Sequence, residues 1–234
     1  MRKCTFRCVS VYLPSMSTQT IFIKLLALTS SFFAFIPFVL ALIRKKYLTK
    51  DLKIICLFLT IGLITDLASE ILTFYFKLSN LEIYNIYIIL ETLLISFFYY
   101  LILPNKISRF LIFSIILFFL IYSIYNVSFN PAKSLDGIIL TIESTSIILF
   151  SVITFNEFLK NSIYSNILAS PIFWINSGFL IFFSGNLFLH IFSNFLQVYE
   201  LNAFFELWVF HSVFNIILYI LISIGFWKSK ISQI

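Results

Sequence analysis

Seven stretches of this sequence are apolar over the length that a helix needs to cross a lipid bilayer. They cover residues 20–43, 54–77, 84–104, 110–126, 138–156, 171–195 and 205–227. A membrane-spanning helix takes roughly 17 to 25 residues. The fourth and fifth stretches are near the short limit, and the connection SFNPAKSLDG can shift either boundary, so the count is seven to within one. We therefore predict seven transmembrane helices.

The composition favours helices over a membrane barrel of β-strands. The chain is 61% hydrophobic and 11% charged, with 31 Phe and 12 Tyr against five Gly and five Pro. Long helices tolerate few Gly and Pro, whereas barrel strands alternate apolar and polar residues. The expected fold is an all-α integral membrane protein, with one membrane domain over residues 20–228 between an N-terminal segment 1–19 and a short tail 229–234.

The distribution of Lys and Arg predicts how the bundle is oriented, because cytoplasmic loops carry an excess of both. Alternate loops and the C-terminal tail hold Arg44, Lys45, Lys46, Lys50, Lys53, Lys106, Arg109, Lys160, Lys228 and Lys230. The opposite loops hold only Lys77 and Lys133. This places the N-terminus outside and the C-terminus in the cytoplasm. Since the net charge of +6 comes largely from short loops, we predict a lipid bilayer and no nucleic acid as partner.

Ionisable residues interrupt the apolar stretches at helical spacing. One face of the second stretch carries Gly62, Asp66, Ser69, Glu70 and Thr73, and one face of the third carries Tyr84, Tyr87 and Glu91. A charged group at the centre of a bilayer costs roughly 3 kcal/mol or more, so such residues face protein or a water-filled cavity. These faces are therefore predicted to point into the bundle.

The polar residues are predicted to share one depth. Glu143 lies near the start of the fifth stretch, His190 is past the middle of the sixth, and His211 is near the start of the seventh, so all fall in the outer half if the N-terminus is outside. We predict an outward-facing polar cavity built by the second, third, fifth, sixth and seventh helices. Its candidate ligand-binding residues are Asp66, Glu70, Tyr87, Glu91, Glu143, Asn186, His190 and His211.

A purely structural role remains open for each of these residues. The acids can hydrogen-bond neighbouring helices in their protonated form, and the histidines can do the same as neutral rings. Glu206 at the start of the seventh stretch suits an interfacial position beside a helix N-terminus. Gly178 and Gly185 repeat at seven residues in the sixth stretch, which predicts close approach of a neighbouring helix.

Two kinds of bound group can be compared with the residues present. A retinal Schiff base needs a lysine within the seventh helix, and the sequence has none there before Lys228, so no retinal is expected. A zinc site would take His190, His211 and Glu91 as candidate ligands and could make the protein a metal-dependent hydrolase of a lipid. Only two histidines occur and no HExxH motif is present, so whether a metal binds stays open.

An outward polar cavity above an apolar inner half, with short basic inner loops, is the layout of a receptor module. YNIYIILETLLISFFYY and PIFWINSGFLIFFSGNLFLHIFSN resemble segments of small seven-helix bacterial membrane proteins, a group that resembles the sensor modules accompanying histidine kinases. The matching residues are Tyr87, Glu91, Trp174, Ser177, Gly178, Gly185 and Asn186. The resemblance implies a bacterial inner membrane and a separate signalling protein such as a histidine kinase. It supplies no catalytic residue.

Three functions therefore stand as expectations. The first is a receptor-like sensor for a small extracytoplasmic ligand, which leaves the protein without an enzymatic activity of its own. The second is the metal-dependent lipid hydrolase. The third is a structural membrane subunit whose polar residues only hold helices together.

The N-terminal residues Arg2, Lys3 and Arg7 oppose the predicted orientation, because they would lie outside. Translation from Met16 would remove them and make the first helix a reverse signal anchor with the short exported end MSTQT. A start at Met16 is the hypothesis that removes this conflict. N-terminal sequencing of the native protein checks it, and peptides from before Met16 would contradict it.

Overall fold

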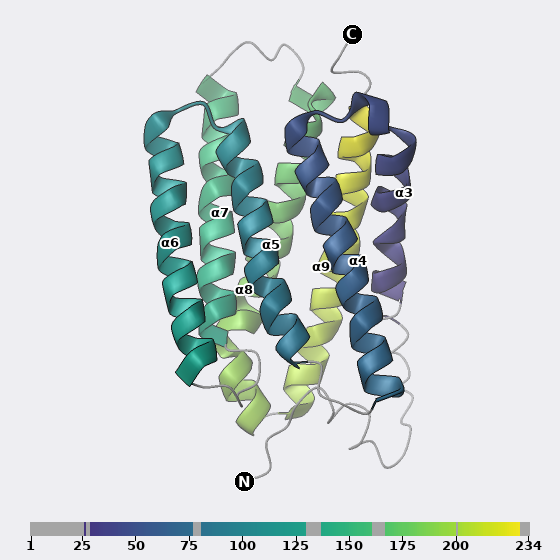
Figure 1. Cartoon of the computed structure of the whole chain (residues 1–234), viewed down its shortest axis with the longest axis vertical. Helices are drawn as coiled ribbons and strands as arrows, with labels where there is room; N and C mark the ends of the chain where they lie inside the picture. The colour runs from purple at the N-terminus through teal and green to yellow at the C-terminus, as the bar shows by residue number, and fades with distance from the viewer. Residues whose placement is uncertain are drawn as a thin grey trace.

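The computed structural model of the chain is an up-and-down bundle of helices (Figure 1). It describes residues 26, 29–76, 81–129, 137–160, 167–199 and 201–229. The helices are α3 (Phe35–Ile43), α4 (Lys50–Phe74), α5 (Leu81–Ile102), α6 (Lys106–Phe129), α7 (Gly137–Lys160), α8 (Pro171–Tyr199) and α9 (Leu201–Lys228), with short 3₁₀ turns at Lys45–Tyr47 and Ile167–Ala169. The described residues contain no strand.

The helices α4 to α9 are each long and apolar enough to cross a membrane, and a shorter apolar helix spans Thr29–Ile43. The prediction of an α-helical, multi-pass membrane bundle is therefore confirmed. The beginning of the first predicted helix, the segment 1–19 and the start at Met16 lie outside the described residues. So do Lys77 and Lys133, and of the tail only Ser229 is described.

Local sequence accounts for several helix boundaries. The first helix is interrupted at Ala34, which is in a turn, because Pro37 has no N–H to bond the carbonyl of Phe33. Pro104 lies in the break between α5 and α6, and Asn105 caps α6 by accepting a hydrogen bond from the Ile107 N–H at 3.0 Å. Pro171 is the first residue of α8, where its fixed backbone angle suits a helix start.

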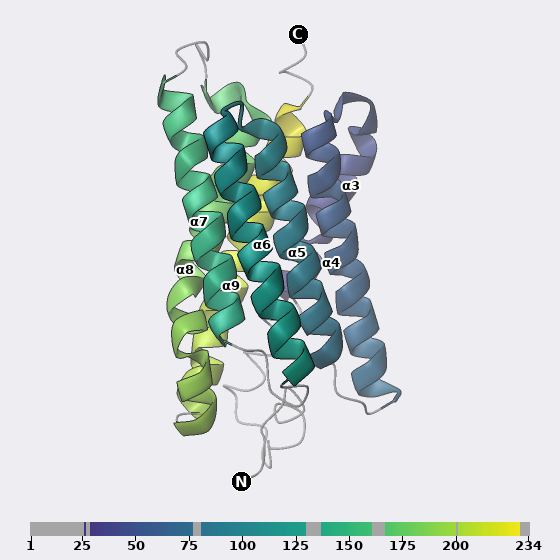
Figure 2. The same ribbon diagram turned by 60° about the vertical axis from the view of Figure 1, so that its left-hand side comes forward.

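The order of packing is a closed ring with one outer helix. Contacts between neighbours run from α3 to α4, α5, α7, α8 and α9 and back to α3, while α6 packs on the outside of α5 and α7 (Figure 2). The closest pair, α8 and α9, depends on glycine. The Phe214 ring lies over Gly185 and Leu218 over Gly178, so a Cβ at Gly185 would be 2.5 Å from the ring. The predicted close approach at these two glycines is confirmed.

The two ends of the bundle differ in chemistry. Every Lys and Arg among the described residues lies at the end where the C-terminus emerges, the top of Figure 1, and we name this the basic end. In that half the interior is a continuous apolar core, which includes the mutually contacting aromatic rings of Phe58, Phe98, Tyr99, Phe150, Phe179 and Phe183. We name this group of rings the aromatic core. The candidate polar residues lie in the other half.

The aromatic core is expected to dominate stability. Phe179 is completely buried and contacts Phe58, Phe98, Tyr99 and Phe183, so Phe179→Ala should destabilise the protein by about 3–5 kcal/mol through lost packing. Phe113→Ala, at a ring that is 62% exposed on α6, should change stability little. Thermal unfolding of both variants in the same detergent measures the difference. Equal effects would show that the core is not packed as described.

Candidate functional site

A chain of carboxyl groups runs from the surface into the bundle. Glu70 near the end of α4 is exposed, Asp66 one turn earlier is half-buried, and Glu91 on α5 is half-buried. Glu143 on α7 is buried, with 2% of its surface exposed. Each acid is close enough to the next to interact electrostatically: Glu70 with Asp66, Asp66 with Glu91, and Glu91 with Glu143. We name these four residues the acid chain.

Tyrosines and a threonine surround the inner members of the acid chain. Thr92 is the direct partner of Glu143, and its hydroxyl donates to Oε1 at 2.7 Å while lying 2.8 Å from the Ile88 carbonyl. Tyr87 hydrogen-bonds Glu91, and its hydroxyl lies against Gly62 of α4, 3.3 Å from where a Cβ would stand. Tyr219 of α9 lies within electrostatic range of both Asp66 and Glu91. Four helices therefore converge on these acids.

The acid chain has no basic counterpart in the described structure. All described Lys and Arg side chains lie at the basic end, and α8 contains none at all. Carboxyls inside a bundle are normally paired with a cation or kept neutral, because an isolated charge there is costly. This half of the protein is therefore suited to accept a positive charge from outside the described chain.

The two histidines form separate hydrogen bonds on the α8 side of the bundle. His190 on α8 is 6% exposed, and its Nδ1 lies 2.7 Å from the Ser144 hydroxyl of α7. His211 on α9 has its Nδ1 3.0 Å from Oδ1 of Asn186, whose amide donates in turn to the Phe182 carbonyl. Each histidine thus joins two neighbouring helices.

The predicted site residues therefore fall into two adjacent groups. Asp66, Glu70, Tyr87, Glu91 and Glu143 belong to the acid chain and its surroundings, whereas Asn186, His190 and His211 form the histidine group. Two connections join them. Glu143 and Ser144 are consecutive on α7 and bond α5 and α8 respectively, and one face of α9 carries His211, Asn215 and Tyr219. Glu206 has a side chain outside the described set.

The metal candidates are not assembled into a ligand set. Among the described side chains, no three His, Cys, Asp or Glu residues come together so that they could hold a metal ion. This includes His190, His211 and Glu91. Instead, His190 contacts Ser144 and His211 contacts Asn186, each through its Nδ1 atom. The Glu91 carboxyl is hydrogen-bonded by Tyr87.

One buried polar group was missed by the sequence reasoning. The Tyr99 hydroxyl of α5 lies 2.6 Å from the Ser151 hydroxyl of α7 and donates to Oδ1 of Asn176 on α8 at 2.8 Å, and the Asn176 amide donates to the Ser151 carbonyl at 3.2 Å. All three residues are completely buried, and the Tyr99 ring belongs to the aromatic core. A signal existed, because Thr92, Ser96 and Tyr99 form a polar face on an otherwise apolar helix.

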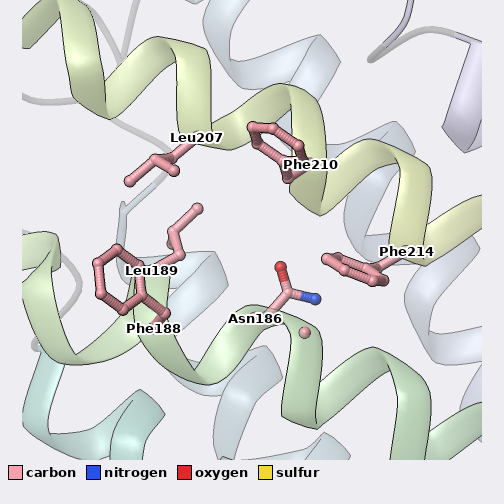
Figure 3. Close-up of a pocket in the computed structure, with 7 residues that line it drawn as sticks. Asn186, Phe188, Leu189, Leu207, Phe210 and Phe214 are labelled. Carbon is pink, nitrogen blue, oxygen red and sulfur yellow. The ribbon is translucent and has the colours of Figure 1, made fainter.

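Two hollows are present on the membrane-facing surface. One, of about 230 Å³, lies between α8 and α9 and includes Asn186 in its lining (Figure 3). The other, of about 410 Å³, lies between α6 and α7 and is lined by Ser114, Ile115, Phe118, Thr141, Ile142, Thr145, Ser146 and Leu149. Neither includes a member of the acid chain, so the outward-facing polar cavity stays a prediction.

Comparison with known proteins gives no relative from which residue roles could be carried over. No protein family, curated protein or solved structure matches the chain. The resemblance to seven-helix sensor modules therefore stays a prediction, and function has to be inferred from the site itself.

The buried Tyr99 group yields a test of this geometry. Tyr99→Phe removes the hydroxyl that joins Ser151 and Asn176, and leaving a buried polar group without its partner costs about 1–3 kcal/mol. The neighbouring Tyr100 is 40% exposed, and its ring lies against Arg109, so Tyr100→Phe keeps its contact and should be nearly neutral. Thermal unfolding of the two variants checks this, and equal stabilities would contradict the described hydrogen bonds.

Proposed function

We propose that this protein is a receptor-like membrane sensor that binds a small cationic ligand at the acid chain and passes the signal to a separate partner protein. The single observation that carries the proposal is the acid chain itself. Four carboxyls connect the surface to the centre of the bundle, and no described Lys or Arg lies among them. A bound cation would offset the cost of ionising these groups inside a membrane.

We infer the orientation from the charges at the basic end. Loops rich in Lys and Arg stay in the cytoplasm, so the basic end is assigned to the cytoplasmic side, with the N-terminus outside and the C-terminus inside. The acid chain then begins at the outer surface with Glu70. A ligand from outside would meet the exposed acid first and the buried Glu143 last.

The graded exposure of the acids supports binding from one side. Glu70 is exposed, Asp66 and Glu91 are half-buried, and Glu143 is buried. The acid chain therefore runs from the surface into the bundle and stops at Glu143. Beyond it lies the aromatic core, whose rings fill the interior of the cytoplasmic half. The buried polar group in that half, Tyr99 with Ser151 and Asn176, is hydrogen-bonded within itself and does not continue the acid chain. The arrangement therefore favours a sensor over a transporter.

The helices that hold the acids could carry the signal. Glu91 on α5 lies within electrostatic range of groups on α4, α7 and α9, so a cation bound there would change the relative stability of two packings of these helices. The same helices run to the basic end, where a cytoplasmic partner would read the change. A histidine kinase in a bacterial inner membrane is the partner that the sequence resemblance favours.

The proposal is tested by ligand-dependent thermal stability of the purified protein. We would screen small primary and quaternary alkylamines, with neutral alcohols of similar shape as controls. A cation present at 100 times its dissociation constant should stabilise the folded state by about 2.7 kcal/mol, which is a rise in melting temperature of roughly 5–10 °C. Glu91→Gln should abolish the rise, because it removes the central carboxyl of the acid chain, the group that would ionise to pair with the cation.

Glu157→Gln provides the matched control. Glu157 is a half-buried acid on α7 at the basic end, so the same substitution there should leave the stabilisation unchanged. No amine that stabilises the wild type, or equal stabilisation of wild type and Glu91→Gln, would overturn the proposal. A Glu91→Gln variant that fails to fold would favour the structural subunit instead.

A further inference from the structure

The hollow between α8 and α9 has the form of a groove that opens toward the membrane. It is lined by Gly185, Asn186, Phe188, Leu189, Leu207, Phe210 and Phe214. Figure 3 shows Phe188 and Leu189 on α8 across a gap from Leu207 and Phe210 on α9, with Asn186 between the two helices. Phe188 is 59% and Phe210 is 58% exposed, so the rim of the groove is made of aromatic rings on the lateral surface of the bundle.

The groove lies within the membrane-crossing part of both helices. Its α8 residues fall inside the span Pro171–Phe192 and its α9 residues inside the span Leu207–Lys228. By the length and composition of these helices, this surface faces lipid. Among the described lining residues only Asn186 has a polar side chain, so water would find too few partners there to stay, while an empty space would lose dispersion contacts along its walls.

Gly185 explains why the groove is not filled by the protein itself. The Phe214 ring rests directly on the α8 backbone at this glycine, where a Cβ would be 2.5 Å from the ring. The Phe214 ring therefore lies deep between the two helices and forms the inner wall of the groove. The outer space, between Phe188 and Phe210, is left for a molecule from the membrane.

From this placement we infer that one acyl chain of a membrane glycerolipid binds in the α8–α9 groove, beside the histidine group. The occupant contacts Asn186, which is 1% exposed and holds Nδ1 of His211 at 3.0 Å. His211 is in turn enclosed by the rings of Phe182 and Trp208. A lipid chain in the groove therefore lies against the residue that hydrogen-bonds His211. Binding of the acyl chain does not depend on the cationic ligand proposed above.

The first test maps the site in the wild-type protein. The full-length chain is reconstituted in phosphatidylcholine vesicles that contain a small fraction of phosphatidylcholine with a photoactivatable diazirine on one acyl chain. After irradiation, peptide mass spectrometry should find adducts concentrated on the groove residues of α8 and α9. Labelling spread evenly over exposed side chains such as Phe113 and Ile121 of α6 would show general contact with the bilayer and overturn the proposal.

The second test blocks the groove from its rim. Leu207→Trp adds a ring to the lining, whereas Ile220→Trp adds the same ring to α9 at a position that is 44% exposed and outside the groove. Native mass spectrometry after mild detergent extraction should find one retained phosphatidylcholine on the wild type and on Ile220→Trp. Leu207→Trp should retain at least tenfold less.

The outcomes separate the alternatives. Equal lipid retention by the two tryptophan variants would overturn the inference, as would the absence of retained lipid on the wild type. A crosslink between two copies of the chain through the groove would also overturn it, because a second copy would then be the occupant. If Leu207→Trp fails to fold, the wild-type labelling map decides alone. Loss of amine binding in Glu91→Gln with unchanged lipid retention would show that the two sites are distinct.

Discussion

The constraint on which this structure depends is that lipid hydrocarbon cannot hydrogen-bond. Backbone groups are satisfied within helices, and polar side chains must find partners inside the bundle. Many hydroxyls do so locally: Thr60, Ser114, Thr141, Ser177 and Ser223 each donate to the carbonyl four residues earlier on their own helix. Fewer polar side chains hydrogen-bond to a different helix. We expect function in the parts of the interior where these contacts occur.

Those cross-helix contacts divide the interior into two halves with different physical character. In the basic half, the aromatic core surrounds one closed group, Tyr99 with Ser151 and Asn176, in which each member contacts another. In the opposite half, the acids lie near one another and no described cation neutralises them. The first arrangement is typical of a structural lock between helices. The second is costly unless the acids stay protonated or a cation binds, and a site that can exchange one state for the other is where we place function.

How much could be predicted varied with the kind of pattern. Helices were predictable because the bilayer requires a minimum apolar length, and the close α8–α9 contact was predictable because Gly178 and Gly185 recur on one face. The shared depth of the candidate residues also followed from counting along alternating helices. Partners were not predictable: nothing in the spacing indicates that Thr92 bonds Glu143, or that Ser144 bonds His190 and Asn186 bonds His211. The position of α6 outside the ring was not predictable either, because its apolar sequence resembles that of the helices inside the ring.

The sequence by itself determined that the chain is an α-helical membrane protein, which residues lie at bilayer depth, and that basic residues gather in alternate connections. Hydrophobic length and charge are properties of local segments, so they can be counted without knowing the neighbours. The tertiary structure alone decided that α7 connects the acid chain to the histidine group through Glu143 and Ser144, and that a groove opens beside Asn186. Both depend on how helices are rotated and paired in the ring, and that pairing is set by side-chain packing between segments far apart in the sequence.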